Sequence, residues 1–287
     1  MGNARRTARR RRLGAELRAL REAADISTEE AAKAIHGDKT KISRQETGLF
    51  RTTRLELEVL LNLYRAEDEK LRRWLIALAA EGNKRSWWHR YSEALANHFK
   101  ETLTLESDAA SIAAFQCRVV PGLLQTQAYA TAVLEGQSQP LSEEQLRLSV
   151  DIRMSRQSIF LRGNPPKYAS VLTEGVIRQQ IGGPQVMADQ LRHLASLSQS
   201  PELAIQVIPY SQGRFTNTSG SFILYSYPEP LEFDVVQVSY LGGDLYLDED
   251  QAVAKYRKAF EELQASALSV QESAELISSI AQELERE

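Results

Sequence analysis

The fold is decided by residues 26–48, which read Ile-Ser-Thr-Glu-Glu-Ala-Ala-Lys-Ala-Ile-His-Gly-Asp-Lys-Thr-Lys-Ile-Ser-Arg-Gln-Glu-Thr-Gly. Ser27 is a favourable N-cap, and Glu30 completes a capping box with it, so the pattern predicts a helix that begins at Thr28. A His-Gly-Asp turn follows, and then a second run of helix-favouring residues begins. The stretch therefore indicates two helices joined by a tight turn.

The turn and the second helix carry their own signals. Gly37 can adopt the positive φ that a tight turn needs, Asp38 can cap the second helix, and Gly48 can end it. The first exposed residues of this helix are expected to be Lys39, Thr40 and Lys41. Cationic and hydroxyl side chains at the N-terminal end of a helix suit it to enter the major groove of DNA and contact base edges. We therefore expect a DNA-binding protein.

Leucines at helical spacing flank this motif on both sides. They predict an amphipathic helix over 13–24 and another over 55–64. We expect an all-α, five-helix helix-turn-helix domain over residues 13–65, with residues 39–47 as its recognition helix.

Residues 1–12 carry six arginines and almost no apolar side chain. Such a segment cannot bury enough surface to fold alone, so we expect a flexible basic arm. The arm could lie along DNA phosphates or in the minor groove, or it could be a mobile tail that aids solubility. The candidates for DNA contact in this arm are Arg9, Arg10, Arg11 and Arg12.

The 287 residues predict about two domains, and their charge is unevenly divided. Residues 1–65 carry 15 basic and 9 acidic side chains, a net of +6, whereas residues 66–287 carry 20 and 29, a net of −9. A cationic head on an anionic body suits a protein that places one end on a polyanion. The single cysteine fits a reducing compartment, and no apolar run is long enough to span a membrane. We expect a cytoplasmic, nucleoid-associated protein with no membrane partner.

The rest of the chain predicts an α+β body. Residues 66–104 have a helical pattern and are expected to form a connector. Within it, Trp87-Trp-His-Arg-Tyr91 could stack on nucleic-acid bases, but the aromatic residues fall at helical spacing, which favours a core anchor. Residues 105–287 are expected to form a regulatory and dimerisation domain, in which helices wrap a small, mostly antiparallel sheet.

Local patterns place the elements of this body. Strands are predicted at 109–120, 168–173, 203–208, 221–227, 234–240 and 244–247, and helices near 125–135, 142–162, 185–199, 249–266 and 270–284. Aromatic side chains on the sheet could line a pocket, although ordinary sheet packing is favoured. These are Tyr225, Tyr227, Phe233, Tyr240 and Tyr246.

The N-terminal region resembles the XRE (Cro/cI-type) helix-turn-helix family in Leu17-Arg-Ala-Leu-Arg-Glu22, Ile26-Ser-Thr-Glu-Glu30 and Ile42-Ser-Arg-Gln-Glu-Thr-Gly48. The resemblance implies a five-helix domain whose third helix enters the major groove. By position, it implies base contacts from Lys39, Thr40 and Ser43. It implies phosphate contacts from Thr28, Lys41, Arg44 and Arg51. It also implies a buried ion pair, Arg21 with Glu46, that joins the first and third helices.

Three positions depart from the usual pattern of that family. Thr28 stands where members usually have a glutamine that supports the recognition helix. Gln45 stands at a position that is normally apolar, and Lys39 stands where glutamine or serine is common. The fold tolerates these changes, but the resemblance carries no operator sequence.

The body is similar to that of large actinobacterial XRE regulators with a C-terminal Scr-type antitoxin-like domain. The stretches that carry this likeness are Trp87-Trp-His-Arg-Tyr91, Val120-Pro-Gly-Leu-Leu-Gln-Thr126, Gly182-Gly-Pro-Gln-Val-Met-Ala-Asp-Gln-Leu-Arg-His-Leu194, Ala204-Ile-Gln-Val-Ile-Pro209 and Leu245-Tyr-Leu-Asp248. The resemblance covers residues 13–284. It implies a transcriptional regulator, often paired with a small protein encoded nearby and linked to developmental or antibiotic control.

No sequence motif points to catalysis. The four histidines lack zinc-like spacing with cysteine, and there is no phosphate-binding loop, nucleophile elbow or dinucleotide fingerprint. Cys117 lies in an apolar strand with no adjacent base, which favours a buried structural thiol over a nucleophile. We expect no enzyme, no metal and no cofactor.

We therefore expect a sequence-specific transcriptional regulator. It would bind operator DNA as a homodimer, because one module makes too few base contacts for a long site. The body would provide dimerisation and a response to a partner or ligand. Two alternatives remain open: an antitoxin-like protein that sequesters a small, basic partner and regulates its own synthesis, and a repressor that senses a small molecule.

Overall fold

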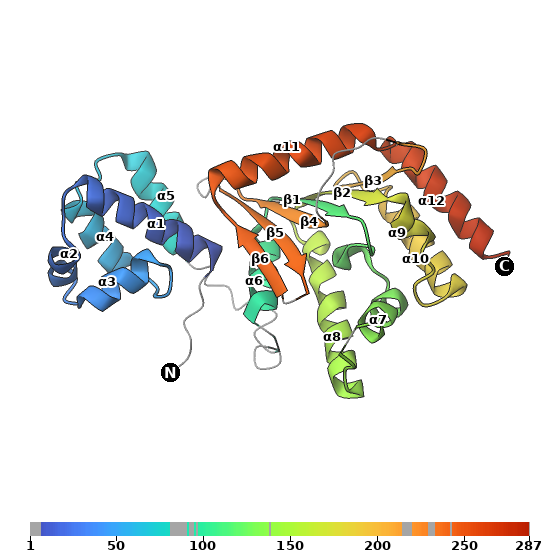
Figure 1. The fold of residues 1–287 in the computed structure, drawn as a ribbon, viewed down its shortest axis with the longest axis horizontal. Helices are drawn as coiled ribbons and strands as arrows, with labels where there is room; N and C mark the ends of the chain where they lie inside the picture. Colours follow the sequence, from blue (N-terminus) through green and yellow to red (C-terminus); the bar gives the residue numbers. More distant parts are fainter. Residues whose placement is uncertain are drawn as a thin grey trace. The chain divides into compact units, whose positions relative to one another are not determined.

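The computed structural model describes residues 7–80, 91, 95, 97–137, 139–213, 220–228, 233–241 and 243–286. The chain divides into two compact units, Met1–Trp87 with Tyr227–Phe233, and Trp88–Ser226 with Asp234–Glu287. Helices build the described part of the first unit, and a six-stranded sheet with helices builds the second (Figure 1). The predicted α+β class, with an all-α N-terminal domain, is confirmed. The predicted core anchor at Trp87 and Trp88 lies outside the described residues.

Five helices form the described N-terminal unit, which we call the head. They are α1 (Ala8–Ala23), α2 (Thr28–Ala34), α3 (Lys39–Glu46), α4 (Arg54–Leu63) and α5 (Glu69–Ala79). Their apolar faces meet in a core that includes Leu17, Ile42 and Leu57. Helix α5 packs on α1 and α4. The head therefore extends past the predicted boundary at residue 65, into the segment that was expected to be a connector.

Helix α1 starts five residues before its predicted start. The hydroxyl of Thr7 caps it by accepting a hydrogen bond from the Arg10 N–H at 3.3 Å. Ala8 is fully buried and Leu13 nearly so, and these two residues anchor the first turns in the head. The expectation of a flexible arm is therefore wrong from Ala8 onward, and Arg9 to Arg12 are helical.

The sheet has the strand order β3-β2-β1-β4-β5-β6. The strands are β1 (Ser111–Gln116), β2 (Lys167–Thr173), β3 (Leu203–Ile208), β4 (Phe222–Ser226), β5 (Asp234–Tyr240) and β6 (Gly243–Leu247). β1, β2 and β3 run parallel, whereas β1, β4, β5 and β6 pair antiparallel. The sheet is thus mixed, and three of its five strand pairings are antiparallel, as the predicted mostly antiparallel sheet requires. Helices in the connections β1–β2 and β2–β3 carry the chain back to the same end of the sheet, which makes parallel pairing possible.

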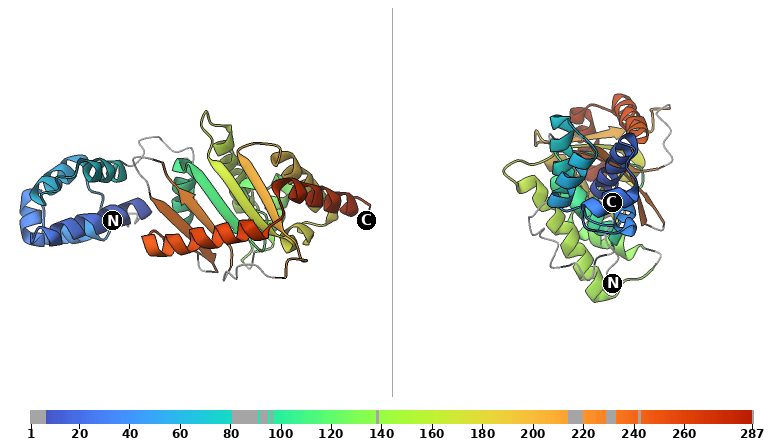
Figure 2. Two further views of the ribbon diagram at one scale, coloured as in Figure 1. Left: turned by 90° about the horizontal axis from the view of Figure 1, so that it is seen from above. Right: turned by 90° about the vertical axis from the view of Figure 1, so that its left-hand side faces the viewer.

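Helices cover both faces of this sheet. They are α6 (Asn97–Asp108), α7 (Gln127–Glu135), α8 (Glu143–Arg156), α9 (Glu174–Arg178), α10 (Pro184–Leu197), α11 (Asp250–Ser266) and α12 (Val270–Leu284), with short 3-10 turns at Gly122–Leu124 and Gln157–Leu161. Helix α11 crosses one face, and α6 and α8 lie on the other (Figures 1 and 2). Under α11, the rings of Phe222 and Phe260 meet edge to face with centroids 6.4 Å apart. The core of the body therefore lies in two layers, one on each side of the sheet.

The two outer edges of the sheet differ. At β3, the connection between α11 and α12 closes the edge: the Leu268 N–H donates to the Val207 carbonyl at 2.9 Å, and the Val207 N–H donates to the Ser273 hydroxyl at 2.9 Å. At β6, no further strand pairs among the described residues. Tyr240, Leu241 and Leu245 are exposed at this second edge.

Candidate nucleic-acid interface

Side-chain caps fix the start of both helices of the α2–α3 motif. The Ser27 hydroxyl accepts from the Glu30 N–H at 3.1 Å, and the Ser27 N–H donates to Glu30 Oε2 at 2.9 Å. The Asp38 carboxylate accepts from the Lys41 N–H at 2.7 Å. These caps satisfy N–H groups that have no partner inside the helix. The predicted capping box and the predicted cap at Asp38 are both present.

The turn between α2 and α3 differs from expectation in one residue. The positive φ falls on His36, at 51°, and not on Gly37. Helix α2 ends at the cap residue Ile35, so His36 occupies the next position, which takes the left-handed conformation. The Gly37 N–H then donates to the Ala32 carbonyl at 2.8 Å and closes the turn.

The three residues expected to contact bases share the exposed face of α3. Lys39, Thr40 and Ser43 are exposed, while Ile42 on the opposite face is buried in the head core. Lys39 Nζ lies 2.8 Å from Glu29 Oε2, with 63% and 54% of the two side chains exposed. A pair so exposed contributes about 0–1 kcal/mol, so it opposes DNA contact only weakly.

The residues expected to contact phosphates are placed differently from one another. Arg44 and Arg51 are exposed, and the Arg44 guanidinium lies 4.9 Å from the centroid of the Phe50 ring. Thr28 is half-buried at the first position of α2. Lys41 is half-buried, and its Nζ lies 2.5 Å from Glu56 Oε1. Although Lys41 is a candidate for phosphate contact, its cationic group is therefore paired with a carboxylate inside the head.

Glu56 links the recognition helix to α4. Its Oε2 accepts hydrogen bonds from Gln45 Nε2 at 3.1 Å and from the Thr53 N–H at 3.0 Å. Burial opposes ionisation of Glu56, but the hydrogen bonds from Lys41 and Thr53 outweigh it and hold its pKa below the usual range. This carboxylate explains how the buried Gln45 occupies a position that is usually apolar. The sequence signal for Glu56 is the capping box Thr53-Arg-Leu-Glu56 at the start of α4.

The expected pair between Arg21 and Glu46 joins α1 to α3. Arg21 Nε and Nη2 lie 2.6 and 3.1 Å from the two carboxylate oxygens of Glu46, and Arg21 Nη1 donates to the Ile26 carbonyl at 3.0 Å. The hydrogen bonds to Glu46 raise the pKa of Arg21. Gly14 lets the helices approach, because a Cβ there would lie 2.4 Å from the Glu46 carbonyl oxygen. Sequence reasoning missed this role of Gly14.

The arginines at the start of α1 lie beside the end of α3. Gly48 has φ +73°, and a Cβ there would lie 2.8 Å from the Arg11 backbone nitrogen.

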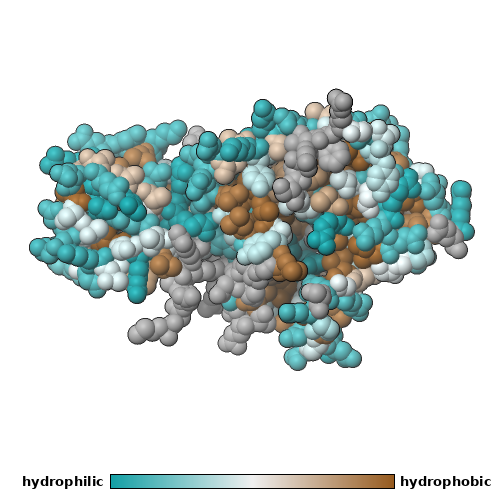
Figure 3. Space-filling view, in the orientation of Figure 1, coloured by the Kyte–Doolittle hydropathy of each residue, from teal (hydrophilic) through white to brown (hydrophobic). Residues whose placement is uncertain are grey.

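Arg12 is directed toward the helices of the head: its Nε is 3.2 Å from Glu16 Oε1, and its guanidinium lies 5.5 Å from the centroid of the Trp74 ring. Hydrophilic residues dominate the described surface of the head on the face shown in Figure 3.

Two family models match the chain. Residues 12–75 match "Helix-turn-helix domain", and residues 99–279, more than half of the chain, match "Domain of unknown function (DUF5753)". The chain belongs to the DUF5753 family. Comparison with curated proteins and with solved structures gives no significant match. The helix-turn-helix match suggests DNA binding, and it reaches into α5, in agreement with the extent of the head.

The DUF5753 domain contains a second buried arginine–glutamate pair. Arg156 Nε and Nη2 on α8 lie 3.0 and 2.5 Å from the carboxylate oxygens of Glu106 on α6, and only 8% and 3% of the two side chains are exposed. One turn earlier, the half-buried Arg153 donates from Nη1 to Gln125 Oε1 at 2.9 Å. Burial, and then the charge of Arg156, lower the pKa of Arg153 to about 10. Glu106 therefore pairs with Arg156, while Arg153 is bound to the side-chain amide oxygen of Gln125.

The aromatic side chains of the DUF5753 sheet are distributed among different contacts. The Tyr225 hydroxyl donates to Gln237 Oε1 at 2.7 Å, and the Tyr246 hydroxyl lies 2.8 Å from Thr102 Oγ1. The rings of Tyr227 and Phe233 stack with centroids 4.9 Å apart, whereas Tyr240 is exposed. These contacts are those of sheet packing and do not gather the five rings around one pocket.

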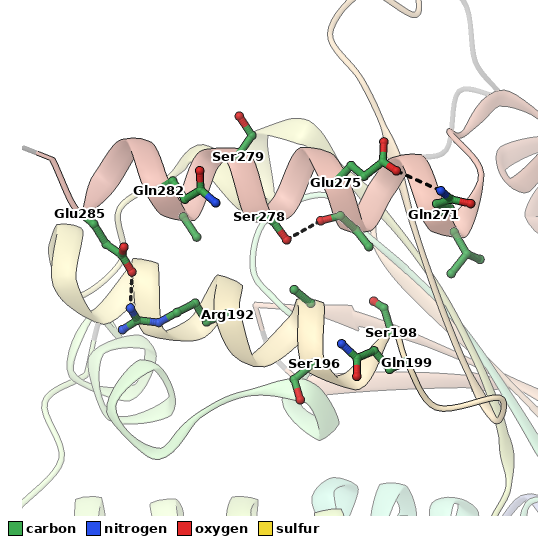
Figure 4. A pocket seen from close by; sticks show the side chains of 14 residues that line it. Arg192, Ser196, Ser198, Gln199, Gln271, Glu275, Ser278, Ser279, Gln282 and Glu285 are labelled. Atoms are coloured by element: carbon green, nitrogen blue, oxygen red, sulfur yellow. Dashed lines mark hydrogen bonds and ion pairs between the residues drawn. The ribbon is translucent and has the colours of Figure 1, made fainter.

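The DUF5753 domain also carries a groove between α10 and α12 (Figure 4). Small and polar residues such as Ser196, Gln199 and Ser278 line it, and an ion pair between Arg192 and Glu285 bridges it. Within the described ranges, no group of His, Cys, Asp or Glu is arranged to hold a metal ion. No helix in those ranges is long and apolar enough to cross a membrane.

Cys117 follows directly after β1. It is only partly buried, whereas the sequence predicted a buried thiol. The hydroxyl of Ser221 accepts from the Cys117 N–H at 3.2 Å and lies 3.5 Å from its sulfur. The residue lies one position past the end of the strand and still packs against the hydrophobic core that contains Phe115 and Phe222.

Proposed function

We propose that this protein is a sequence-specific, XRE-type transcriptional regulator whose helix α3 reads the major groove. The observation that carries the proposal is that α3 has one face exposed and the opposite face packed in the head. Lys39, Thr40 and Ser43 are exposed on one face, while Ile42 and the Arg21–Glu46 pair fix the other face in the head. A helix held rigidly and offering donor side chains is what base-edge recognition requires.

Phosphate contacts would come from residues around α3. Arg44 on α3 and Arg51 after it are exposed, Thr28 is the first residue of α2, and Arg9 to Arg11 begin α1 beside the end of α3. A net charge of +6 over residues 1–65 supports binding to a polyanion in a cytoplasmic, nucleoid-associated setting. No catalytic role is assigned to the body.

We propose that the regulator acts as a homodimer. One head supplies three base-contacting candidates, too few to select a long unique site, and two heads would contact half-sites about one helical turn apart. The DUF5753 domain, which we liken to the Scr-type antitoxin-like domain, would hold the two copies together.

Genome-wide mapping of bound sites, followed by footprinting on those sites, tests the proposal. Wild-type protein should protect discrete sites, and Lys39→Ala with Thr40→Ala should lose that selectivity while thermal unfolding stays unchanged. Lys258→Ala, an exposed lysine on α11 of the body, serves as the matched control and should leave the footprint intact. Identical footprints from wild type and the double variant would refute α3 as the reading helix.

A second candidate function is an antitoxin-like clamp. The net charge of −9 over residues 66–287 favours it, because an acidic body suits a small, basic protein, for example one encoded nearby. Co-purification of such a protein with the full chain, lost at high salt, would support this function.

A third candidate is a repressor that senses a small molecule. The guanidinium of Arg153, whose hydrogen bond goes to the neutral side chain of Gln125, favours this function, since a half-buried cation would suit an anionic ligand. A change of operator affinity with an added ligand would reveal it.

A further inference from the structure

The recognition helix carries two lysines near its start, and the structure pairs them with different carboxylates. Resting on the DNA-binding function proposed above, we propose that Glu56 withholds Lys41 from DNA. Lys41 is then not a phosphate contact, and Glu56 is a positioning residue that fixes α3 on α4.

The first support is geometric. Glu56 Oε1 lies 2.5 Å from Lys41 Nζ, while Glu56 Oε2 accepts from Gln45 Nε2 at 3.1 Å and from the Thr53 N–H at 3.0 Å. Both oxygens are therefore engaged, and three donors from two segments hold the carboxylate in place. Lys41 and Gln45 lie one turn apart on α3, so one carboxylate fixes one side of the helix along a full turn.

The second support is the contrast with Lys39. Its pair with Glu29 leaves 63% and 54% of the side chains exposed, whereas only 32% and 16% of Lys41 and Glu56 are exposed. Water and salt screen the attraction between Lys39 and Glu29, whereas partial burial reduces this screening for Lys41 and Glu56. A DNA phosphate can therefore draw Lys39 away from Glu29 far more easily than Lys41 away from Glu56.

The third support is the anionic state of Glu56. The hydrogen bonds from Lys41 and Thr53 keep its pKa low in spite of burial, so the carboxylate is charged at neutral pH. Moving Lys41 to a phosphate would leave that charge without its cationic partner in a half-buried site, which is costly.

The salt dependence of DNA binding measures whether Lys41 contacts a phosphate. Each phosphate that a lysine neutralises adds about 0.9 to the slope of log K against log salt. We therefore compare wild type, Lys41→Gln, Glu56→Gln and the double variant on duplex DNA of arbitrary sequence, because phosphate contacts do not depend on sequence. Arg44→Gln is the positive control, and Glu67→Gln, at an exposed glutamate between α4 and α5, controls for the loss of one negative charge.

We expect Lys41→Gln to leave the slope unchanged and Glu56→Gln to steepen it by about 0.9, with binding about three- to tenfold tighter at moderate salt. The double variant should return to the wild-type slope, and Arg44→Gln should reduce it. Glutamine also serves as the third residue of a capping box, so the start of α4 is preserved in Glu56→Gln, and thermal unfolding verifies this.

Two results would overturn the inference. One is a slope reduced by about 0.9 in Lys41→Gln, which would place Lys41 on a phosphate already. The other is a slope for Glu56→Gln no steeper than that for Glu67→Gln. If Glu56→Gln does not fold, Lys41→Gln alone decides. Failure of the proposed function looks different, because wild type would then show no salt-dependent binding at all.

Discussion

The head and the body each contain a buried arginine–glutamate pair, but the two pairs differ in their balance of charge. In the head, Arg21 pairs with Glu46, with 11% and 8% of the two side chains exposed, and a second carboxylate, that of the exposed Glu22, lies 3.6 Å from Arg21 Nη2. In the body, Arg156 and Glu106 are more deeply buried, and Arg153 adds a second cation beside them. The charge beside the pair is thus negative and exposed in the head, at Glu22, but positive and half-buried in the body, at Arg153.

The largest expected effect comes from breaking the pair in the body. Arg156→Met should destabilise the body by about 3–5 kcal/mol, because Glu106 would remain buried without a counter-charge. Urea unfolding of the full chain, with hydrogen exchange in α6 and α8 to localise the change, measures this loss. Adding Glu106→Leu should recover most of it, and a loss below about 1 kcal/mol would show that the pair is weakly coupled to folding.

Breaking the pair in the head should have a smaller effect on stability. Arg21→Met should cost about 3 kcal/mol, at the lower end of the range for buried pairs, because more of this pair is exposed. DNA affinity should fall together with hydrogen-exchange protection of α3. A variant that unfolds α3 but binds DNA normally would separate the pair from the reading function.

Removing the second arginine of the body should change stability least among these substitutions. Arg153→Met on α8 should lower the free energy of unfolding by about 1–2 kcal/mol, because the buried Gln125 Oε1 loses its donor but no carboxylate loses its paired cation. Urea unfolding of this variant, compared with that of Arg156→Met one turn away, measures the difference in unfolding free energy. Destabilisation equal to that of Arg156→Met would mean that both guanidinium groups are needed to compensate Glu106.

Acidification should reveal the carboxylate chemistry of the head. The folded state holds the pKa of Glu56 below its ordinary value of 4.5, so its contribution to stability is present above that pH and is lost as the pH falls through the lower folded value. The stability difference between wild type and Glu56→Gln should therefore shrink as the pH falls from about 6 to about 3. Urea midpoints across this range measure it, and a constant difference would contradict the assignment.

Local signals account for the parts of the fold that the sequence predicted well. The capping boxes at Ser27 and Ser269 set helix starts, and strands 203–208 and 234–240 have the predicted bounds. The start of α1 was missed because the buried Ala8 is surrounded by arginines, which dominate the local composition. The parallel pairing of β1 with β2 depends on how α7 and α8 pack, which no local pattern records.

In the candidate site, too, contacts between residues far apart in the chain were the ones that sequence reasoning missed, unless the family resemblance supplied them. The Arg21–Glu46 pair followed from family resemblance, and the exposed face of α3 followed from its spacing. The pairing of Lys41 with Glu56 could not be predicted from the sequence, because Glu56 lies 15 residues further along the chain and its only local signal is that of a helix cap. The Arg156–Glu106 pair spans 50 residues between two helices, and neither residue stands in a recognisable motif.

The covered edge at β3 also limits how copies of this chain can associate through their sheets. A sheet with two open edges can add neighbours at both ends without limit, as in a fibril. Here Leu268 and Ser273 occupy the backbone groups of Val207, so among the described strands β6 alone is left to pair outward. Two copies that met at β6 would use up their only available edges, and growth would stop at a closed, two-fold pair. Pairing of copies through β6 would therefore give a closed dimer and not a polymer.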